Sequence, residues 1–518
     1  MAMEVAAARS AMEADNILRA RAEGHGRPVI STDFKGYRFV AVGKRMYYGK
    51  EWRFFTDFLL HHMKDVLGRG WGTRMAAQVG VHPLFDWLQQ MNDLEARAEK
   101  PETGVFAVRG EGVAIGVFRF AYALYLIAHH DEIPATLIRR LRQPSEFLAA
   151  VVETIAFATF ALAGFRIEMG ETRKGVGPEG EFRATSAKAG KTFNVEAKRK
   201  NGWRNPVDVH DLAFRQELAV WLERKIRDAS NKRLSDPIFW LELSIPGLSA
   251  IEEAEALQTL VREALRRAEG RIRIGGEVPP PAYVFVASHG YLAGGDDSSL
   301  YMLEGFHIPM RVKGEIVEIE QAMIERDRDR DVVWILDCLR KVQQIPHHFD
   351  GTPDDLVGPD RKPIERIRVG QRLEVTLPDA PSVSGLVTHV VSRGVTAAVV
   401  IVDEATGVQR IVEIPLSEDE QRAAAALGDA VFGNANGTEK LPEEDSLSLY
   451  DFFLKGYAST PREKLLEFVA DHPNAAEFSS LPTEDLRIRV CREWTKSALS
   501  RHPHHGVQPS ADENATGA

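Results

Sequence analysis

Apolar residues in the first part of the chain are spaced as in a few short strands followed by helices. Residues 30–50 have the pattern of short strands. Apolar positions then recur at helical spacing through Glu51–Gly68, where the glycine ends the run. Residues 82–143 contain further helical stretches, so a mostly helical domain is expected over 30–143. The preceding residues, 1–29, are expected to form a frayed arm.

Two stretches, 113–128 and 147–165, are apolar enough to suggest a membrane hairpin. Arg119 interrupts the first stretch and Glu153 interrupts the second. A charge near the middle of a membrane span costs about 2.5–3.5 kcal/mol on insertion scales. Both stretches are therefore expected to be core helices, and no membrane association is predicted.

From residue 164 the pattern changes to strands that alternate with helices. Two long helices are predicted over 211–234 and 250–270. The strand candidates around them are GFRIEMG, EFRATSAK, TFNVEAK, PIFWLELSI and AYVFVASHG. This alternation predicts an α/β domain over 144–345, in which helices cover a mixed sheet.

The last third of the chain is expected to hold two smaller parts. After a linker rich in Pro, Gly and Asp at 346–363, short strands at regular spacing predict a small β-barrel over 364–418. Helices are predicted over 446–500, and a disordered tail over 501–518. The predicted fold class is therefore multidomain α/β, with a central mixed sheet flanked by helices.

Composition and charge exclude several classes of protein. The 518 residues exceed what a single hydrophobic core usually covers, and 44% hydrophobic with 27% charged residues is typical of a folded soluble chain. With 65 basic and 75 acidic residues, the net charge of -10 excludes a protein that coats nucleic acid by bulk charge. Any basic site must therefore be local.

Cysteine usage and the N-terminal segment indicate a location in the reducing cytoplasm. Cys338 and Cys491 are the two cysteines, and they form no CxxC motif. This excludes a cysteine zinc cluster and a disulfide scaffold. The N-terminal segment carries Glu4, Glu13 and Asp15 where an export signal needs an apolar run. No export signal is therefore predicted.

Candidate chemistry is concentrated in residues 146–204. The strand period of two places Asn194, Glu196 and Lys198 on one face of TFNVEAK, while the residues between them are apolar. A hairpin through 186–191 brings Glu181 near Glu196. Two converging carboxylates raise each other's pKa unless a cation lies between them. Such oxygen ligands suit Mg²⁺ or Mn²⁺ better than zinc, and a nearby lysine supplies a point charge for water or phosphate.

This ordered set, a helical Glu, a strand acid and Glu-x-Lys on the next strand, resembles the PD-(D/E)xK nuclease superfamily with its restriction-endonuclease-like fold. The resemblance covers about residues 144–310. It implies that Glu181 and Glu196 bind a divalent metal together with the backbone carbonyl of Ala197. Lys198 is then expected to assist the nucleophilic water. Glu153 is expected to orient or complete the metal shell.

The strand acid departs from the family pattern. That position is usually Asp, whereas this chain has Glu181, and Glu179 is an alternative two residues earlier. Glu181 is preferred because it is expected within the strand, beside the apolar Phe182. A second Glu-x-Lys, at 223–225, lies in a predicted helix, where positions i and i+2 do not share a face.

Local charge favours a phosphate-bearing partner. Residues 166–204 contain ten basic and five acidic residues, although the whole chain is acidic. A basic rim around an acidic pocket attracts a phosphodiester backbone, while the pocket holds the metal. The candidate nucleic-acid contacts are Lys191, Arg199, Lys200, Arg204 and Lys232, with Arg227 as a further candidate. Trp203 is expected to pack in the core rather than stack on a base.

The sequence thus predicts a Mg²⁺- or Mn²⁺-dependent nuclease that hydrolyses phosphodiester bonds, with DNA favoured over RNA. The β-barrel is a candidate surface for a protein partner. Two alternatives remain open. One is a catalytically silent nuclease fold that binds nucleic acid or scaffolds a complex, and the other is an interaction protein whose β-barrel does the binding.

Overall fold

The computed structural model describes most of the chain. The described ranges are 2–23, 27–77, 80–97, 112–169, 180–187, 190–203, 207–248, 250–310, 319–349, 351–358, 363–377, 380–434, 446–470 and 472–500. The chain divides into two compact units, one formed by 1–308 with 331–437 and the other by 309–330 with 438–518. The region predicted as a helical domain and residues 144–308 of the predicted α/β domain thus belong to one compact unit, while residues 309–330 belong to the other.

The N-terminal segment is a helix, not the predicted frayed arm. Helix α1 spans Ala2–Glu23, and its buried residues Ala7, Ala14 and Leu18 join a hydrophobic cluster with Val387 and neighbouring residues of the last sheet. Alanine has the highest helix propensity, and the three buried positions lie close to one helix face. Packing against distant residues therefore stabilises a segment that looked unpartnered in the sequence.

Three short strands follow, as predicted for residues 30–50. They are β1 (Ile30–Phe34), β2 (Tyr37–Val42) and β3 (Arg45–Gly49), paired antiparallel in the order β1-β2-β3. The helices after them are α2 (Phe55–Val66), α3 (Arg69–Ala76), α4 (Pro83–Arg97), α5 (Gly112–His130) and α6 (Ala135–Leu141). This part of the chain is mostly helical, in agreement with the sequence.

Helix α5 and helix α7 (Phe147–Leu162) are the two very apolar stretches noted in the sequence. Among the described residues, α5 is the one helix long and apolar enough to cross a membrane, and 72% of its most apolar window is buried inside the protein. In α7 the buried residues run almost without a break from Phe147 to Leu162. Both are core helices of this fold, as expected.

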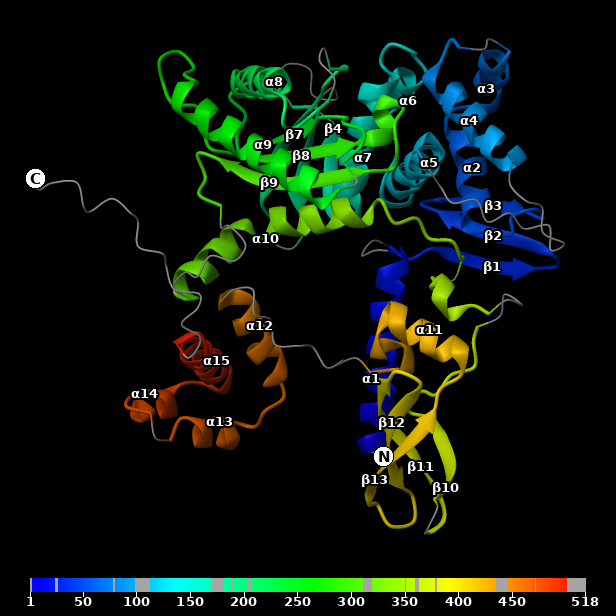
Figure 1. The fold of residues 1–518 in the computed structure, drawn as a ribbon, viewed down its shortest axis with the longest axis vertical. Coiled ribbons are helices and arrows are strands. Elements are labelled where there is room, and N and C mark those ends of the chain that lie inside the picture. The colour runs from blue at the N-terminus through cyan, green and yellow to red at the C-terminus, as the bar shows by residue number, and fades with distance from the viewer. Residues whose placement is uncertain are drawn as a thin grey trace, which may run out of the picture. The chain divides into compact units, whose positions relative to one another are not determined.

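A mixed sheet of six strands forms the centre of the first unit (Figure 1). Its strands lie in sequence order: β4 (Phe165–Met169), β5 (Phe182–Ser186), β6 (Thr192–Arg199), β7 (Pro237–Glu242), β8 (Ala282–His289) and β9 (Ser299–Phe306). Strands β6, β7 and β8 run parallel, and the other pairs are antiparallel. The mixed sheet predicted from the alternating pattern is confirmed.

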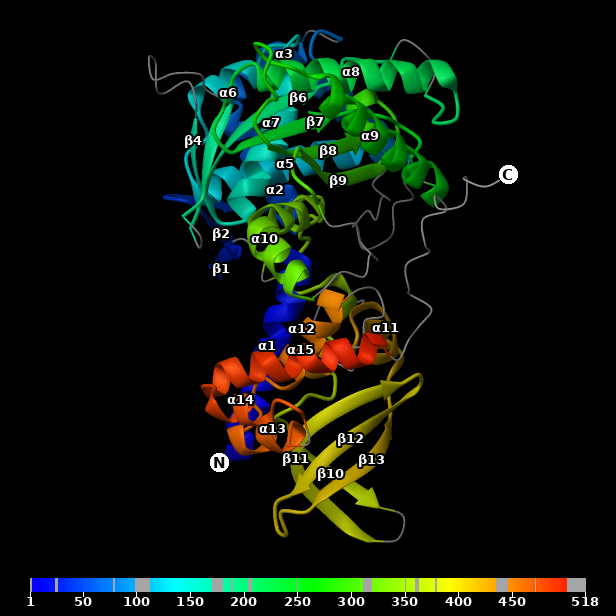
Figure 2. The same cartoon turned by 90° about the vertical axis from the view of Figure 1, so that its left-hand side faces the viewer.

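Helices cover both faces of this sheet (Figure 2). Helices α8 (Leu212–Ser230) and α9 (Ile251–Arg271) pack in one cluster with Phe239 and Leu241 of β7. On the other face, α7 packs its phenylalanines against Phe182 of β5, with ring centroids 5.3–5.4 Å apart. Strand residues alternate between the faces, so β5, β6 and β7 are held between two hydrophobic layers.

The predicted small β-barrel is an open, curled sheet. Its strands are β10 (Arg372–Leu377), β11 (Ala380–Arg393), β12 (Thr396–Asp403) and β13 (Gln409–Pro415), and β10 and β13 are the two edges. Helices α1 and α11 (Glu418–Leu427) and the 3₁₀ turn η4 (Asp429–Phe432) contribute buried residues to its core. These helices pack against the apolar residues of the sheet and so complete its hydrophobic core.

The second unit is helical. It contains α12 (Ser446–Gly456), α13 (Arg462–Phe468), α14 (Ala475–Ser480) and α15 (Thr483–Ser500), as well as the beginning of α10 (Ile319–Lys341). Helices were predicted over 446–500, and this is confirmed. The predicted disordered tail, 501–518, lies outside the described residues.

Candidate active site on the central sheet

Strand β6 places a fully buried carboxylate on the face of the sheet covered by α8 and α9. In the parallel register Glu196 lies beside Phe239, and Lys198 lies beside Leu241. Both apolar neighbours belong to the cluster formed with these helices, and residues in register share a face. Glu196 and Lys198 of TFNVEAK therefore share one face of strand β6, as predicted.

The hairpin formed by β5 and β6 brings Glu181 to Glu196. The Glu181 N–H donates to the Val195 carbonyl over 2.8 Å, and Phe182 lies opposite Val195 in the register. The predicted approach of the two acids is thus present. Strand β5 begins at Phe182, so Glu181 lies one residue before the strand rather than within it. Glu179, the alternative strand acid, lies outside the described residues.

The Lys198 ammonium lies between the two carboxylates. Its Nζ is 2.6 Å from Oε1 of Glu196 and 3.6 Å from Oε1 of Glu181. Burial lowers the pKa of Lys198, but the hydrogen bond and negative charge of Glu196, with the charges of Glu181 and Glu153, outweigh burial and raise the pKa. This lysine therefore remains a cation at neutral pH.

A second lysine contacts the same buried carboxylate. Lys232 follows α8, and its Nζ donates to Oε2 of Glu196 over 2.6 Å. Oε1 of Glu196 lies 2.6 Å from both ammonium groups. Two cations thus compensate the two acids of the cluster, which explains how a charged group is tolerated at zero exposure.

Glu153 of α7 lies close enough to influence this cluster, but an arginine binds it. Arg140 of α6 donates to both carboxylate oxygens, with one nitrogen-to-oxygen distance of 2.8 Å, and also to Glu146 over 3.0 Å. Burial, and next the negative charge of Glu181, raise the pKa of Glu153 to about 7 despite Arg140. Sequence reasoning missed Arg140, because only the packing of α6 against α7 brings the two residues together.

Three of the side chains predicted to contact nucleic acid interact with other groups of the protein. Lys191 lies over the Phe193 ring, 4.9 Å from its centroid. Arg199 donates to the Leu292 carbonyl over 3.0 Å, and burial lowers the pKa of its guanidinium. Lys200 is nearly buried, pairs with Glu217 over 2.8 Å and donates to a backbone carbonyl.

The other predicted nucleic-acid contacts are Lys232, Arg227 and Arg204, and their surroundings differ. Lys232 contacts the buried acid Glu196. Arg227 instead pairs with Glu223 on the surface of α8, at 2.7 Å. Arg204 lies outside the described residues. Lys198 and Lys232 are thus the cations that the structure brings to the buried acid.

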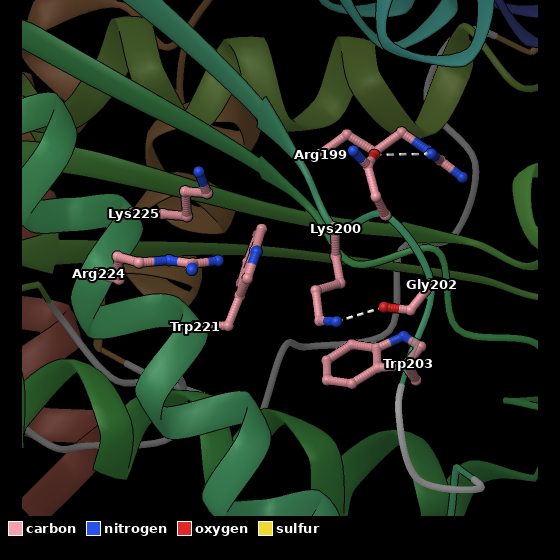
Figure 3. Close-up of a pocket in the computed structure, with 8 residues that line it drawn as sticks. Arg199, Lys200, Gly202, Trp203, Trp221, Arg224 and Lys225 are labelled. Atoms are coloured by element: carbon pink, nitrogen blue, oxygen red, sulfur yellow. Dashed lines mark hydrogen bonds between the residues drawn. The ribbon is translucent and has the colours of Figure 1, made fainter. Parts of the chain in front are cut away.

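A basic pocket opens between the end of β6 and α8 (Figure 3). Trp221, Arg224 and Lys225 reach into it from α8, while Lys200 and Trp203 lie on the opposite side. Trp203 also packs against the core, with its indole nitrogen donating to a backbone carbonyl over 3.2 Å, as the sequence suggested. Lys200 and Lys198 share one face of the strand, so the pocket lies on the same face as the acidic cluster.

The sequence did not predict Arg224 and Lys225 as pocket residues. They belong to the Glu-x-Lys at 223–225, which was set aside because it lies in a helix. A usable signal was present in the sequence: Glu217, Trp221 and Lys225 follow one another at helical spacing. This spacing places them on one side of α8, which faces β6. Arg224 is exposed beside them.

The oxygen atoms of the cluster suit a hard divalent cation that takes only a few of its ligands from the protein. The Val195 carbonyl points to the β5 side of the strand, and alternate carbonyls of a strand point the same way, so that of Ala197 does too. Two carboxylates and this carbonyl are oxygen ligands of the kind that Mg²⁺ and Mn²⁺ accept. Within the described ranges, no group of three His, Cys, Asp or Glu could hold a metal ion. Water and substrate oxygens must supply the remaining ligands.

No family model, no curated protein and no solved structure matches the chain.

Proposed function

We propose that this protein is a Mg²⁺- or Mn²⁺-dependent nuclease whose site is formed by Glu181, Glu196 and Lys198. The observation that carries the proposal is the position of the Lys198 ammonium, which contacts carboxylates from both sides of the β5–β6 hairpin. A buried acid held by two lysines, on the same face of the sheet as a basic pocket, suits phosphodiester chemistry.

The order of elements around the cluster supports the same proposal. Helix α7 carries Glu153, strand β5 follows Glu181, strand β6 carries Glu196 and Lys198, and α8 and β7 come next. This is the succession of helix, acidic strand, Glu-x-Lys strand, helix and strand that the nuclease resemblance requires. Glu153, Glu196 and Lys198 thus come from the expected elements, while Glu181 directly precedes its expected strand.

A divalent cation bound by Glu181, Glu196 and the Ala197 carbonyl would supply charge neutralisation at the phosphate and a more acidic water. Lys198 lies between the two acids, so its ammonium would have to shift toward a phosphate or water oxygen for a divalent cation to be held there. Lys232 can continue to compensate Glu196 during that exchange. The long lysine side chain makes such a movement feasible without changing the strand.

The basic pocket is the proposed binding site for a neighbouring phosphate. Arg224 and Lys225 extend from α8 on the same side of the sheet as the cluster. Cations in this position hold the backbone in register without reading its sequence. Nucleic acid is therefore the proposed substrate, with DNA placed before RNA, and the protein partner of the curled sheet remains a separate proposal.

The test is cleavage of plasmid, single-stranded DNA and RNA by the full-length protein with Mg²⁺, Mn²⁺ or chelator. Cleavage should require metal and be lost in Glu196→Ala and Lys198→Ala. Glu223→Gln is the matched control, because it alters the helical Glu-x-Lys, whose glutamate pairs with Arg227 at the surface. Mn²⁺ binding followed by electron paramagnetic resonance gives a second readout, which Glu196→Ala should weaken.

A catalytically silent nuclease fold is the second candidate. The observation favouring it is that Lys198 and Lys232 already compensate both oxygens of Glu196, so the cluster is electrostatically balanced without a metal. This function predicts nucleic-acid binding with no metal-dependent cutting and no Mn²⁺ signal. Such a result would replace the nuclease proposal.

A further inference from the structure

The sheet formed by β1, β2 and β3 is more deeply buried on one face than on the other, as far as the described residues show. Val40 and Val42 are buried on β2, and Tyr47 of β3 packs against Phe58 and His62 of α2, with ring centroids 5.7 and 5.4 Å apart. Successive side chains of a strand point to opposite faces. The residues between these positions therefore form a second face, which α2 does not cover.

Large apolar and aromatic side chains occupy that second face. Tyr37, Phe39 and Tyr48 form a group on β2 and β3, with ring centroids 6.0–6.5 Å apart. Phe34 of β1 lies opposite Tyr37 in the register, and Phe34 and Tyr48 are 60% and 65% exposed. We call these four residues the aromatic face. Figure 1 shows the sheet of β1–β3 that carries these residues. Large apolar side chains gathered on one surface indicate an interaction site rather than scattered surface residues.

Cations accompany these rings. The Lys50 ammonium lies 4.6 Å from the centroid of Tyr37, and that of Lys35 lies 5.3 Å from the centroid of Phe34. Residues 30–53 contain six basic and two acidic residues, in a chain of net charge -10. The aromatic face therefore carries two lysines and belongs to a segment of net positive charge.

We propose that the aromatic face binds single-stranded nucleic acid, with bases stacked on Tyr48 and Phe34 and phosphates near Lys35 and Lys50. Unpaired bases offer free ring faces to aromatic side chains, and the strand backbone is attracted by neighbouring cations. A duplex is a poorer ligand because its bases already stack on one another. A second copy of the chain is also a poorer occupant, since lysines are depleted where protein interfaces are most buried.

This inference does not depend on the nuclease proposal, with which it shares only the class of ligand. The aromatic face is built from β1–β3, and the acidic cluster from the β5–β6 hairpin. Binding and cleavage can therefore fail separately. A protein that binds single strands without cutting them would retain this inference and lose the nuclease proposal.

The experiment measures fluorescence anisotropy of labelled oligo(dT) and oligo(U) with the full-length protein in chelator, so that cleavage cannot contribute. Stacking on one ring contributes enough that its removal should weaken binding about ten-fold. Tyr48→Ala and Phe34→Ala should each show this loss, whereas Tyr48→Phe should bind nearly as tightly as the original protein. Lys50→Gln should weaken binding less and reduce its dependence on salt concentration.

Ile411→Ala is the matched control, since Ile411 is a 75% exposed apolar residue on β13. Thermal unfolding of every variant establishes that the fold is retained. Equal affinities of Tyr48→Ala, Phe34→Ala and the original protein would overturn the inference, as would tighter binding of duplex than of single strands. A dimer in light scattering that Tyr48→Ala dissociates would also overturn it, in favour of self-association.

Discussion

Glu196 and Glu242 are both fully buried glutamates on adjacent strands of one sheet, yet their surroundings differ. Glu242 accepts hydrogen bonds from the backbone N–H groups of Ser244 and His289, over 2.8 and 3.0 Å. It also contacts Nδ1 of His289 at 2.7 Å. Glu196 is held instead by two lysine ammonium groups.

The difference separates a structural carboxylate from a candidate catalytic one. The partners of Glu242 are themselves buried, so its charge is enclosed by fixed donors. The lysines at Glu196 have side chains 25% and 37% exposed, so solvent reaches the cations around this acid. Burial alone therefore does not distinguish the two acids, whereas the exposure of their partners does.

The largest expected effect is on catalysis at Glu196. Glu196→Gln keeps the shape of the side chain but removes the charge that a divalent cation needs. The initial rate of metal-dependent cleavage should fall by roughly a thousand-fold, equivalent to about 4 kcal/mol at the transition state. Circular dichroism should show an unchanged fold. Retention of cleavage within a few-fold of the original rate would remove Glu196 from the mechanism.

The next effect concerns stability at Glu242. Glu242→Ala leaves buried donors of Ser244 and His289 without an acceptor, and breaking a buried pair in this way costs about 3–5 kcal/mol. The Tm of the first unit should therefore fall by several degrees in differential scanning calorimetry. Glu223→Gln, at the surface of α8, should leave Tm unchanged. If Glu242→Ala melts like the original protein, the contrast between the two acids is wrong.

A pH-dependent effect is expected from Glu153, whose pKa rises from its ordinary value of 4.5 to about 7 in the folded protein. Between these pH values the folded state holds a proton that the unfolded state has lost. Stability must therefore decrease as pH rises from about 4.5 toward 7. Glu153→Gln lacks this proton equilibrium, so its Tm should change less with pH over that range when both proteins are measured in chelator. Identical pH profiles would show that Glu153 does not titrate there.

The smallest effect is expected in the basic pocket. Replacing Arg224 and Lys225 together by alanine should weaken binding of nucleic acid only a few-fold, since each would supply one phosphate contact in the proposed complex. The slope of log affinity against log salt concentration should decrease by about one for each residue. Arg227→Ala is the control, because Arg227 is paired with Glu223 outside the pocket. A salt slope unaffected by the double variant would exclude the pocket from the binding surface.

The local sequence pattern was sufficient to predict which strands form the site and which side chains share a face. The alternation of TFNVEAK places Glu196 and Lys198 on one face, and the short connection at 186–191 fixes which residue of β5 lies opposite. Both features depend on neighbours within about twenty residues, through the pleat of a strand and the closure of a hairpin. For the same reason, the strands of residues 30–50 and the alternation of strands and helices after residue 164 were predictable.

The sequence by itself thus determined which charged residues leave β6 together and that Glu181 approaches them. Only the tertiary structure decided their partners: Arg140 for Glu153, Lys232 for Glu196 and His289 for Glu242, which are separated by 13, 36 and 47 residues. It also decided that α1 packs against a sheet near residue 387 and that this sheet stays open. A buried charge requires a partner. The residues next to it in sequence do not indicate which distant group becomes that partner, because the packing of helices and sheets determines it.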